Sequence, residues 1–506
     1  MHQALKLKKM KVSTSIATRI FNTNLRPLFR QISTDTAATV ATKEHIMNQI
    51  YKVGSTGGKV SDVLQRIIKK GQDVTRFTLI DCFKDLRKKG RYQQCLEILD
   101  WLEKDITDLP GRDFPLRIDI LHKLKGLDEA EDYFDGIPSK SRYVYGSLLN
   151  CYCTDLETDK AFATFKEMDE MGFAASNVLA YNNLLNLCLK IKHPEMVPQL
   201  ISEMKQNHLP LNSHAYSFWI QSYRLLGDVA GVERVFHEAQ EDILVKDDWV
   251  IHSNVVSVFI EFGQFEKALS HLEKLENDSD NLSRNSFQHL ISLYAGAGKL
   301  DSVIRTWNKL KSKFKVEHKQ SYLSLLQALS RLDDIKGLEN YFHEWESICK
   351  KHYDDRVPAV VIGAYLRHDM VKEAELLLKD ATEKAGKVLR WPHVKFMKYY
   401  LEKGQTECAL KHMEAAIVSK WKPLAEKLDP WFQHFKDEKD VVGLEKFCEL
   451  LKRTQALDIK AYLWLLETYV DAEKTAPDMR QRIKKDGIIV TPELEELLER
   501  VCPGGV

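Results

Sequence analysis

The chain has 506 residues, of which 44% are hydrophobic and 29% charged, and its formal net charge is +1. A single hydrophobic core stops growing at roughly 250–300 residues, so this length favours several domains or an elongated repeat array. Proline (14) and glycine (23) are scarce, which favours helices over a turn-rich β fold. The sequence lacks a run of about eighteen apolar residues that would span a membrane, and its nine cysteines form no CxxC pair.

The first 34 residues differ in composition from the rest of the chain. They carry seven Lys or Arg residues and several Ser and Thr, and the first acidic residue is Asp35. Such acid-free, basic segments are typical of organellar transit peptides. We therefore expect residues 1–32 to be a mitochondrial transit peptide cleaved after Ile32, with a disordered basic arm as the alternative. From residue 33 onward the formal charge is −6, because +1 loses seven positive charges and no negative one.

Residues 33–75 read as a linker with one or two short helices, interrupted by the flexible run 54–58. A repeat follows, with a period of 35 or 36 residues. Its landmark is an aromatic residue or histidine early in an apolar-periodic run, found at Tyr145, Tyr181, Tyr216, His252, Phe287 and Tyr322.

Each unit contains two runs with apolar residues at helical spacing, separated by a polar turn. In residues 143–177 the first run precedes the turn at 154–158, and Gly172 ends the second run. Alanine recurs where the two helices should cross closely, at Ala130, Ala161, Ala268, Ala374 and Ala409. A single hairpin of this kind cannot bury its apolar face, so the hairpins must stack on one another.

The period predicts an all-α fold, namely a right-handed α-solenoid superhelix of about 11–12 helix-turn-helix repeats of about 35 residues. The expected boundaries are the helical or linker segment 33–75, the repeat array 76–490 and a C-terminal tail at 491–506.

The units resemble pentatricopeptide repeats, which read roughly Y-N-x-L-I, then G-x-x-x-x-A-x-x-x-F-x-x-M, then G-x-x-P-(N/D). The Trp and Leu-Gly landmarks of tetratricopeptide repeats are absent. The segments that carry the resemblance are 181–185 (YNNLL), 165–168 (FKEM) and 209–212 (LPLN). It covers about four fifths of the chain and is clearest over residues 142–248. It implies a plant mitochondrial member of the plain (P) class.

The resemblance also implies how the repeats would bind RNA, since such repeats read one base each with two or three side chains. The residue after the landmark and the last residue of the repeat read the base, and an apolar residue near the repeat start sandwiches it. In this chain the implied pairs are Asn182 with Asn212, Ser217 with Asp248, and Ser253 with Ser283; the implied sandwiching residues are Leu179 and Val250.

The Asn–Asn pair favours a pyrimidine and the Ser–Asp pair leans towards a purine. The other units depart from the usual Asn, Thr or Ser at the reading position, where they carry Gly146, Gln288, Leu323, Ala359 and Val394. Leu, Ala and Val side chains offer no hydrogen bond to a base edge, so most of the array is not expected to read sequence.

Basic residues near the ends of the first helices form a candidate line of phosphate contacts, because such contacts add affinity without sequence information. They are Lys88, Lys123, Lys190, Arg331 and Arg367. The alternative for each is an ordinary solvated charge.

The sequence carries no catalytic motif. It lacks the H-x-E and C-x-x-C pair of zinc deaminases, and the HEAQE run at 237–241 lacks the second histidine of a zinc protease. We therefore expect a non-catalytic protein without cofactor or metal, which binds single-stranded RNA in the mitochondrial matrix and acts in transcript stability, processing or translation. The alternative is a protein-binding scaffold associated with the mitochondrial ribosome, suggested by the charge of −6 and the departures at the reading positions.

Overall fold

The computed structural model describes residues 39–40, 42–54, 58–105, 113–277, 282–314, 319–348, 353–424 and 427–502. The proposed transit peptide lies outside these residues. The chain divides into two compact units, Met1–Phe218 and Trp219–Val506, which are described separately. Both are helical, apart from a parallel pairing of two-residue strands, β1 (Thr39–Val40) and β2 (Gln72–Asp73), in the first unit.

Helices follow one another in pairs joined by short turns, and we call the even-numbered helices first helices and the odd-numbered ones second helices. Those that begin in the first unit are α2 (Lys43–Gly54), α3 (Val60–Lys69), α4 (Arg76–Lys88), α5 (Tyr92–Asp105), α6 (Phe114–Lys125), α7 (Leu127–Asp135), α8 (Arg142–Asp155), α9 (Thr158–Glu170), the 3-10 helix η1 (Ala174–Ser176), α10 (Val178–Lys190), α11 (Met196–Gln206) and α12 (Ser213–Leu225).

The second unit continues the same alternation. Its helices are α13 (Val229–Glu241), α14 (Trp249–Glu261), α15 (Phe265–Asn277), α16 (Arg284–Gly296), α17 (Leu300–Lys313), α18 (Lys319–Arg331), α19 (Ile335–Ile348), α20 (Arg356–Arg367), α21 (Val371–Ala385), α22 (Arg390–Glu402), α23 (Thr406–Val418), α24 (Asp429–Asp437), α25 (Val441–Arg453), α26 (Ile459–Asp471), α27 (Met479–Lys485) and α28 (Pro492–Val501).

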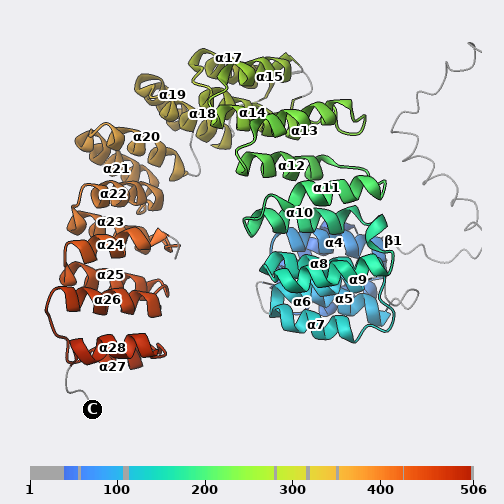
Figure 1. Ribbon diagram of the computed structural model, residues 1–506, viewed down its shortest axis with the longest axis horizontal. Coiled ribbons are helices and arrows are strands. Elements are labelled where there is room, and N and C mark those ends of the chain that lie inside the picture. The colour runs from blue at the N-terminus through green and yellow to red at the C-terminus, as the bar shows by residue number, and fades with distance from the viewer. Residues whose placement is uncertain are drawn as a thin grey trace, which may run out of the picture. The chain divides into compact units, whose positions relative to one another are not determined.

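First helices pack on the first helices of neighbouring pairs. In the first unit α6 contacts α8 and α8 contacts α10; in the second unit the same contacts run from α14 through α16, α18 and α20 to α22 (Figure 1). In chain order α4 to α27 make twelve pairs, in line with the predicted number. The predicted all-α repeat solenoid is thereby confirmed.

The backbone repeats with the same period as the sequence. A residue in the left-handed conformation, which lets the chain reverse after a helix, ends the first helix of one pair after another. These residues are Leu156, Lys192, Gly227, Gly263, Gly298, Asp333, Asp369, Gly404, Lys439 and Glu473. Since successive members are 34 to 36 residues apart, the period continues well beyond the six units that the sequence landmarks identified.

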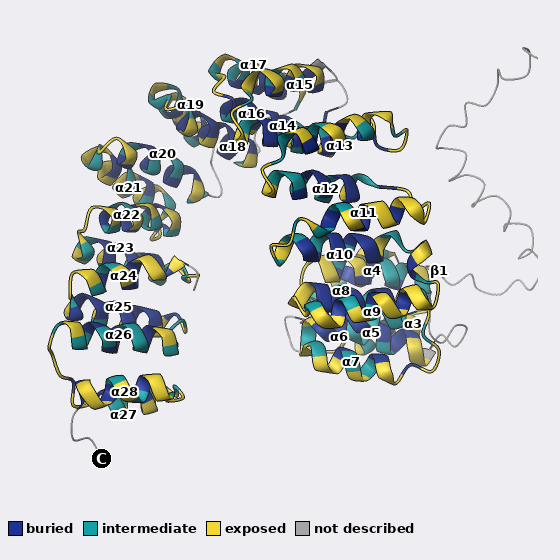
Figure 2. Ribbon diagram, viewed as in Figure 1, coloured by how far each residue is buried: buried dark blue, intermediate teal, exposed yellow. Residues whose placement is uncertain are grey.

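The core lies between the helices, where buried residues line the facing sides (Figure 2). Each of the five alanines expected at close helix crossings is fully buried. The landmarks Tyr181, Tyr216 and Tyr322 are at most 2% exposed, as expected of core side chains. Gly172, at φ +70°, follows the last turn of α9 and ends that helix as predicted.

Both ends of the array differ from the predicted boundaries. The pair α2 and α3 packs against α4 and α5 in the manner of a further repeat. At the other end, the predicted tail 491–506 contains α28, which contacts α26 and buries Leu494, Leu498 and Val501. The predicted C-terminal tail therefore begins with a helix that packs on the last repeats.

Candidate nucleic-acid interface

In several repeats the last residue caps the first helix of the next one. Its side-chain oxygen accepts a backbone N–H of the first turn, which satisfies a donor that the helix itself leaves unpaired. The three predicted cases are Asn212 with Ala215 N at 3.0 Å, Asp248 with Val250 N at 2.7 Å and Ser283 with Ser286 N at 3.2 Å. In these three repeats the cap fixes the position of the repeat-end member of the predicted base-reading pair.

Asn182 and Asn212 are brought together by the fold. Asn182 lies in the first turns of α10 and its Nδ2 donates to Asn212 Oδ1 at 3.3 Å, so this oxygen accepts both the cap bond and the inter-repeat bond. Asn182 is 8% exposed, and its own Oδ1 is buried without a hydrogen-bond partner. An unpaired buried acceptor is costly, so a donor that reached this oxygen would be held there.

The predicted serines are bonded to their own helices. Ser217 Oγ donates to the carbonyl of Ser213 at 2.6 Å, and Ser253 Oγ donates to the carbonyl of Val250 at 3.0 Å. Ser253 is only 3% exposed. With their hydrogens engaged, both hydroxyls can offer a base only an acceptor.

Asn177 is a further residue of this kind that the sequence analysis missed. It stands 35 residues before Asn212 and caps α10 through Ala180 N at 3.1 Å. Its Nδ2 lies 3.4 Å from where a Cβ of Gly146 would stand, so it occupies the space beside the missing reading side chain. The 35-residue register would have found it.

The predicted sandwiching residues are apolar and exposed. Leu179 on α10 is 64% exposed and Val250 on α14 is 48% exposed. The same register, three residues before the reading position, also holds exposed aromatic residues on other first helices: Phe77, Tyr143 and Trp391. The sequence analysis missed these three residues because it assigned no base-reading residue to the repeats that contain them.

The five predicted phosphate contacts fall into two groups. All five are exposed near the ends of their helices, and Lys88, Lys190 and Arg331 are held by no ion pair within the described residues. Lys123 is ion-paired with Asp119 at 3.0 Å, and Arg367 Nη2 donates to the carbonyl of Ser330 at 2.6 Å. The last two are therefore engaged in contacts within the fold.

Asp119 explains why Lys123 is held. Burial alone would raise the pKa of this carboxyl, but hydrogen bonds from Arg87 and Lys123 outweigh burial and the pKa is lowered. A buried carboxylate kept ionised in this way needs both cations.

Comparison with known proteins identifies the repeats. A family model described as PPR repeat matches residues 143–173, and one described as pentatricopeptide repeat domain matches residues 164–224. Two mitochondrial pentatricopeptide repeat-containing proteins of Arabidopsis thaliana are 36% and 37% identical to this chain, over 97% and 92% of it and 99% and 88% of their own length. The chain belongs to the pentatricopeptide repeat family. Large ribosomal subunit protein mL101 of the same plant is 32% identical, over 91% of this chain and 95% of its own.

Several repeats of this pentatricopeptide repeat protein use the reading position for packing. Gln288 Nε2 donates to Ser321 Oγ at 2.8 Å between α16 and α18, and both residues are buried. Leu323 and Ala359 are buried at 5% and 3% exposure. Val394 is half-buried on α22. At these positions the first helices contact each other instead of presenting a polar group.

Other kinds of site find no support in the described part of the pentatricopeptide repeat chain. Three or more His, Cys, Asp or Glu side chains do not gather there in a way that could hold a metal ion. Among the helices described, none combines the length and apolar character needed to cross a membrane.

Proposed function

We propose that this chain binds single-stranded RNA in the mitochondrial matrix and acts, without catalysing a reaction, in the stability, processing or translation of a transcript. The observation that carries the proposal is the Asn182–Asn212 contact of 3.3 Å beside the exposed Leu179. This site combines polar groups able to bond a base edge with an apolar surface for its face. The mitochondrial location is supported by the names of the two Arabidopsis relatives.

In this proposal a base gives up its hydrogen bonds to water and forms hydrogen bonds with the side-chain amides of Asn182 and Asn212. Asn182 Oδ1 is buried without a partner, and Asn212 Oδ1 already holds the cap of α12. A base edge that donates to the first oxygen, once the Asn182 side chain turns outward, removes an unsatisfied acceptor. Leu179 covers one face of the base, while Phe77, Tyr143, Val250 and Trp391 stack on bases of any identity elsewhere.

The test is a titration of the full chain with a random pool of single-stranded RNA at about 50 and about 200 mM salt, followed by sequencing of the bound RNA. Phosphate contacts weaken steeply over this range. We expect binding at low salt, enrichment of a short motif and loss of affinity at high salt. Absence of binding at low salt contradicts the proposal.

Asn182→Ala is the sharpest variant. It should weaken the enriched RNA by about 1–3 kcal/mol, as expected for loss of a paired base contact, and should leave unrelated RNA unaffected. Lys190→Ala is the matched control, because loss of a phosphate contact weakens all RNAs alike. Equal effects of Asn182→Ala on all sequences would show that this site does not read a base.

A protein-binding scaffold is the second candidate function. It is favoured by the formal charge of −6 from residue 33 onward, by the engagement of Lys123 and Arg367 within the fold, and by a relative that is a large ribosomal subunit protein. Sedimentation of the endogenous protein with and without ribonuclease separates the two functions. Co-migration with a protein complex that survives ribonuclease supports the scaffold.

A further inference from the structure

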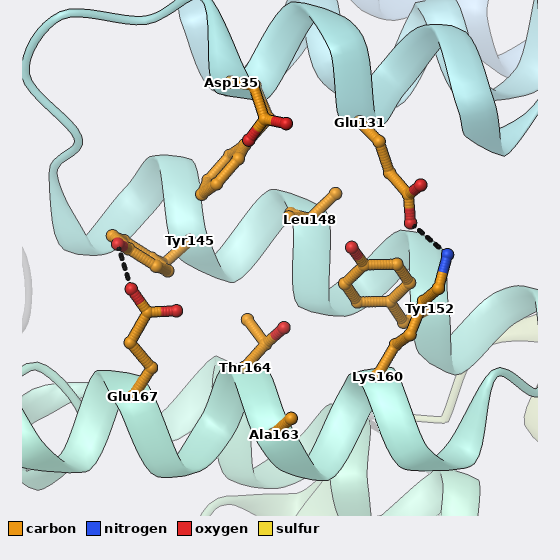
Figure 3. A pocket seen from close by; sticks show the side chains of 10 residues that line it. Glu131, Asp135, Tyr145, Leu148, Tyr152, Lys160, Ala163, Thr164 and Glu167 are labelled. Carbon is orange, nitrogen blue, oxygen red and sulfur yellow. Dashed lines mark hydrogen bonds and ion pairs between the residues drawn. The ribbon is translucent and has the colours of Figure 1, made fainter.

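A hollow of about 410 Å³ opens between α7, α8 and α9. Figure 3 shows the second helices α7 and α9 on its two sides and α8 between them. Its lining combines aromatic rings, of Phe134, Tyr145 and Tyr152, with the carboxylates of Glu131, Asp135 and Glu167. Polar contacts cross it: Tyr145 donates to Glu167 Oε1 at 2.7 Å, Lys160 donates to Glu131 Oε1 at 2.7 Å, and the Tyr152 hydroxyl also bonds Glu131.

The tyrosine contact recurs along the array. In several repeats the landmark tyrosine donates its hydroxyl hydrogen to a carboxylate on or just after the second helix, or accepts a hydrogen bond from an amide there. The described cases besides Tyr145 are Tyr322 with Glu344 at 2.7 Å, Tyr462 with Asp486 at 2.7 Å, and Tyr181, which accepts from Asn207 at 3.0 Å. Glu344 stands 22 residues after its tyrosine, as Glu167 does.

The other two carboxylates of this series each have a lysine. Lys311, on the preceding second helix, pairs with Glu344 at 2.6 Å, and Lys452 pairs with Asp486. These lysines stand eleven and ten residues before their tyrosines. The neutral Asn207 requires no such partner.

Glu167 lacks the lysine that pairs with Glu344 and Asp486 in their repeats. Eleven residues before Tyr145 the chain has Phe134 instead of lysine, and among the described residues no cation is paired with Glu167. Lys160 is occupied by Glu131, and Lys140 lies over the Phe134 ring at 4.9 Å and donates to the Ile137 carbonyl at 3.3 Å. The hollow thus occurs where other repeats place their own cation.

We propose that this hollow receives an arginine side chain of a partner protein. A guanidinium can bond Glu167 through two parallel N–H groups and lie against the neighbouring Tyr145 ring, which an ammonium group does less well; Lys140 and Lys160 already lie over the rings of Phe134 and Tyr152. Asp135 adds a second negative charge, so the lining carries three carboxylates against one lysine. The charge and the aromatic walls therefore both favour a cationic, planar group.

The site is separate from the candidate RNA interface. Tyr145 and Tyr152 stand two and nine residues after the exposed Tyr143 on α8. At 3.6 residues per turn, both point to the side of the helix roughly opposite Tyr143. A protein partner and an RNA strand can therefore occupy the two faces of α8 together, and neither proposal depends on the other.

The test uses the full chain and a short acetylated, amidated peptide with one arginine, and binding is followed by ligand-observed NMR at low salt. The control peptide carries citrulline, which keeps the shape of arginine but removes its charge. We expect the arginine peptide to bind at least about fivefold more tightly than the citrulline peptide, as for a charge-assisted hydrogen bond.

Three variants locate the site. Glu167→Gln should weaken the arginine peptide about fivefold, and Phe134→Lys should abolish binding by supplying the missing cation. Glu170→Gln, which removes the same charge three residues further along α9, should change affinity less than about twofold. Glu167→Gln keeps an acceptor for Tyr145 and should leave RNA affinity unchanged.

Absence of arginine-peptide binding overturns the proposal, as does equal binding of the citrulline peptide. An equal effect of Glu167→Gln and Glu170→Gln also overturns it, because binding would then follow the general charge of the helix. Since the readout is peptide binding, failure here leaves the RNA proposal intact, and loss of RNA binding leaves this one intact.

Discussion

The carboxamide oxygen of Asn212 accepts two hydrogen bonds, from the backbone of Ala215 at 3.0 Å and from Asn182 at 3.3 Å. The bond from Ala215 stabilises the start of α12, and the bond from Asn182 forms the candidate base-reading pair. The Asn212 side chain thus both caps α12 and contributes to the candidate base-reading pair. Substitutions at this residue can separate the two contributions.

Asn212→Ala should lower stability by about 1 kcal/mol, because the helix loses its cap, and should also weaken the preferred RNA. Asn212→Asp keeps the cap oxygen, so it should retain stability while it changes the preferred base. Urea unfolding and sequencing of bound RNA measure the two effects. Equal stability loss in both variants would show that the cap bond contributes nothing.

Leu179→Ala should weaken every RNA by about 1 kcal/mol, since contact with a base face is indifferent to its identity. At 64% exposure, Leu179 should contribute little to folding. Leu187 on the same helix is fully buried, and Leu187→Ala should instead cost about 2–5 kcal/mol of stability. Unchanged RNA affinity in Leu179→Ala would contradict the sandwiching role.

At the scale of the helix pair, α22 and α23 are joined by two histidines. His393 Nδ1 and His412 Nδ1 are 2.9 Å apart, and the His412 ring stacks on Phe396 with centroids 4.7 Å apart. One nitrogen must donate and the other accept, so the contact is lost when both rings are protonated. Burial, followed by the repulsion of His393, lowers the pKa of His412 to about 4, and burial lowers the pKa of His393 as well.

The stability of this pair should therefore fall in acid. The unfolded chain binds a proton at the ordinary histidine pKa of about 6.5 while the folded pair stays neutral, so stability decreases as the pH falls from about 6.5 to about 4. Urea midpoints at pH 7 and 4.5 measure the effect. His412→Phe keeps the stacking and should flatten the pH dependence; an unchanged dependence in this variant would assign it to other groups.

The helix pairs also show how far the sequence predicts the site. The period and the buried landmarks follow from register, because equivalent residues take equivalent places in stacked units, and the family resemblance implied the pairing of Asn182 with Asn212. The engagement of Lys123 by Asp119 and of Arg367 by Ser330 did not follow from it. Contacts of this kind depend on side-chain reach and on the polar groups that packing brings near.

At the scale of the whole molecule, RNA affinity must come from a few cations, because the chain from residue 33 onward has a formal charge of −6. All five predicted phosphate contacts are exposed, but Lys123 and Arg367 are engaged within the fold, which leaves Lys88, Lys190 and Arg331 for phosphate. For single strands the logarithm of affinity falls with the logarithm of salt by about 0.7 per contact, so we expect a slope of about −2, against about −3.5 for five contacts.

Lys190→Ala should reduce the magnitude of that slope by about 0.7. Arg367→Ala is the comparison, because this guanidinium is bonded to Ser330 and should contribute to the packing of α18 and α20 without changing the slope. Binding measured at several salt concentrations gives both values. A larger effect of Arg367→Ala on the slope would place this arginine at the RNA backbone.

The sequence by itself determined the repeat, its helix pairs, the residues that form their core and the register of the candidate base-reading positions. It did so because helix formation and apolar periodicity are local properties that each unit repeats. The tertiary structure decided which of the predicted cations are engaged within the fold, that α28 packs at the end of the stack, and that Glu167 lies in a hollow without the lysine found in two other repeats. These features depend on contacts between residues of neighbouring helices, and only the stacking of the helices brings those residues together.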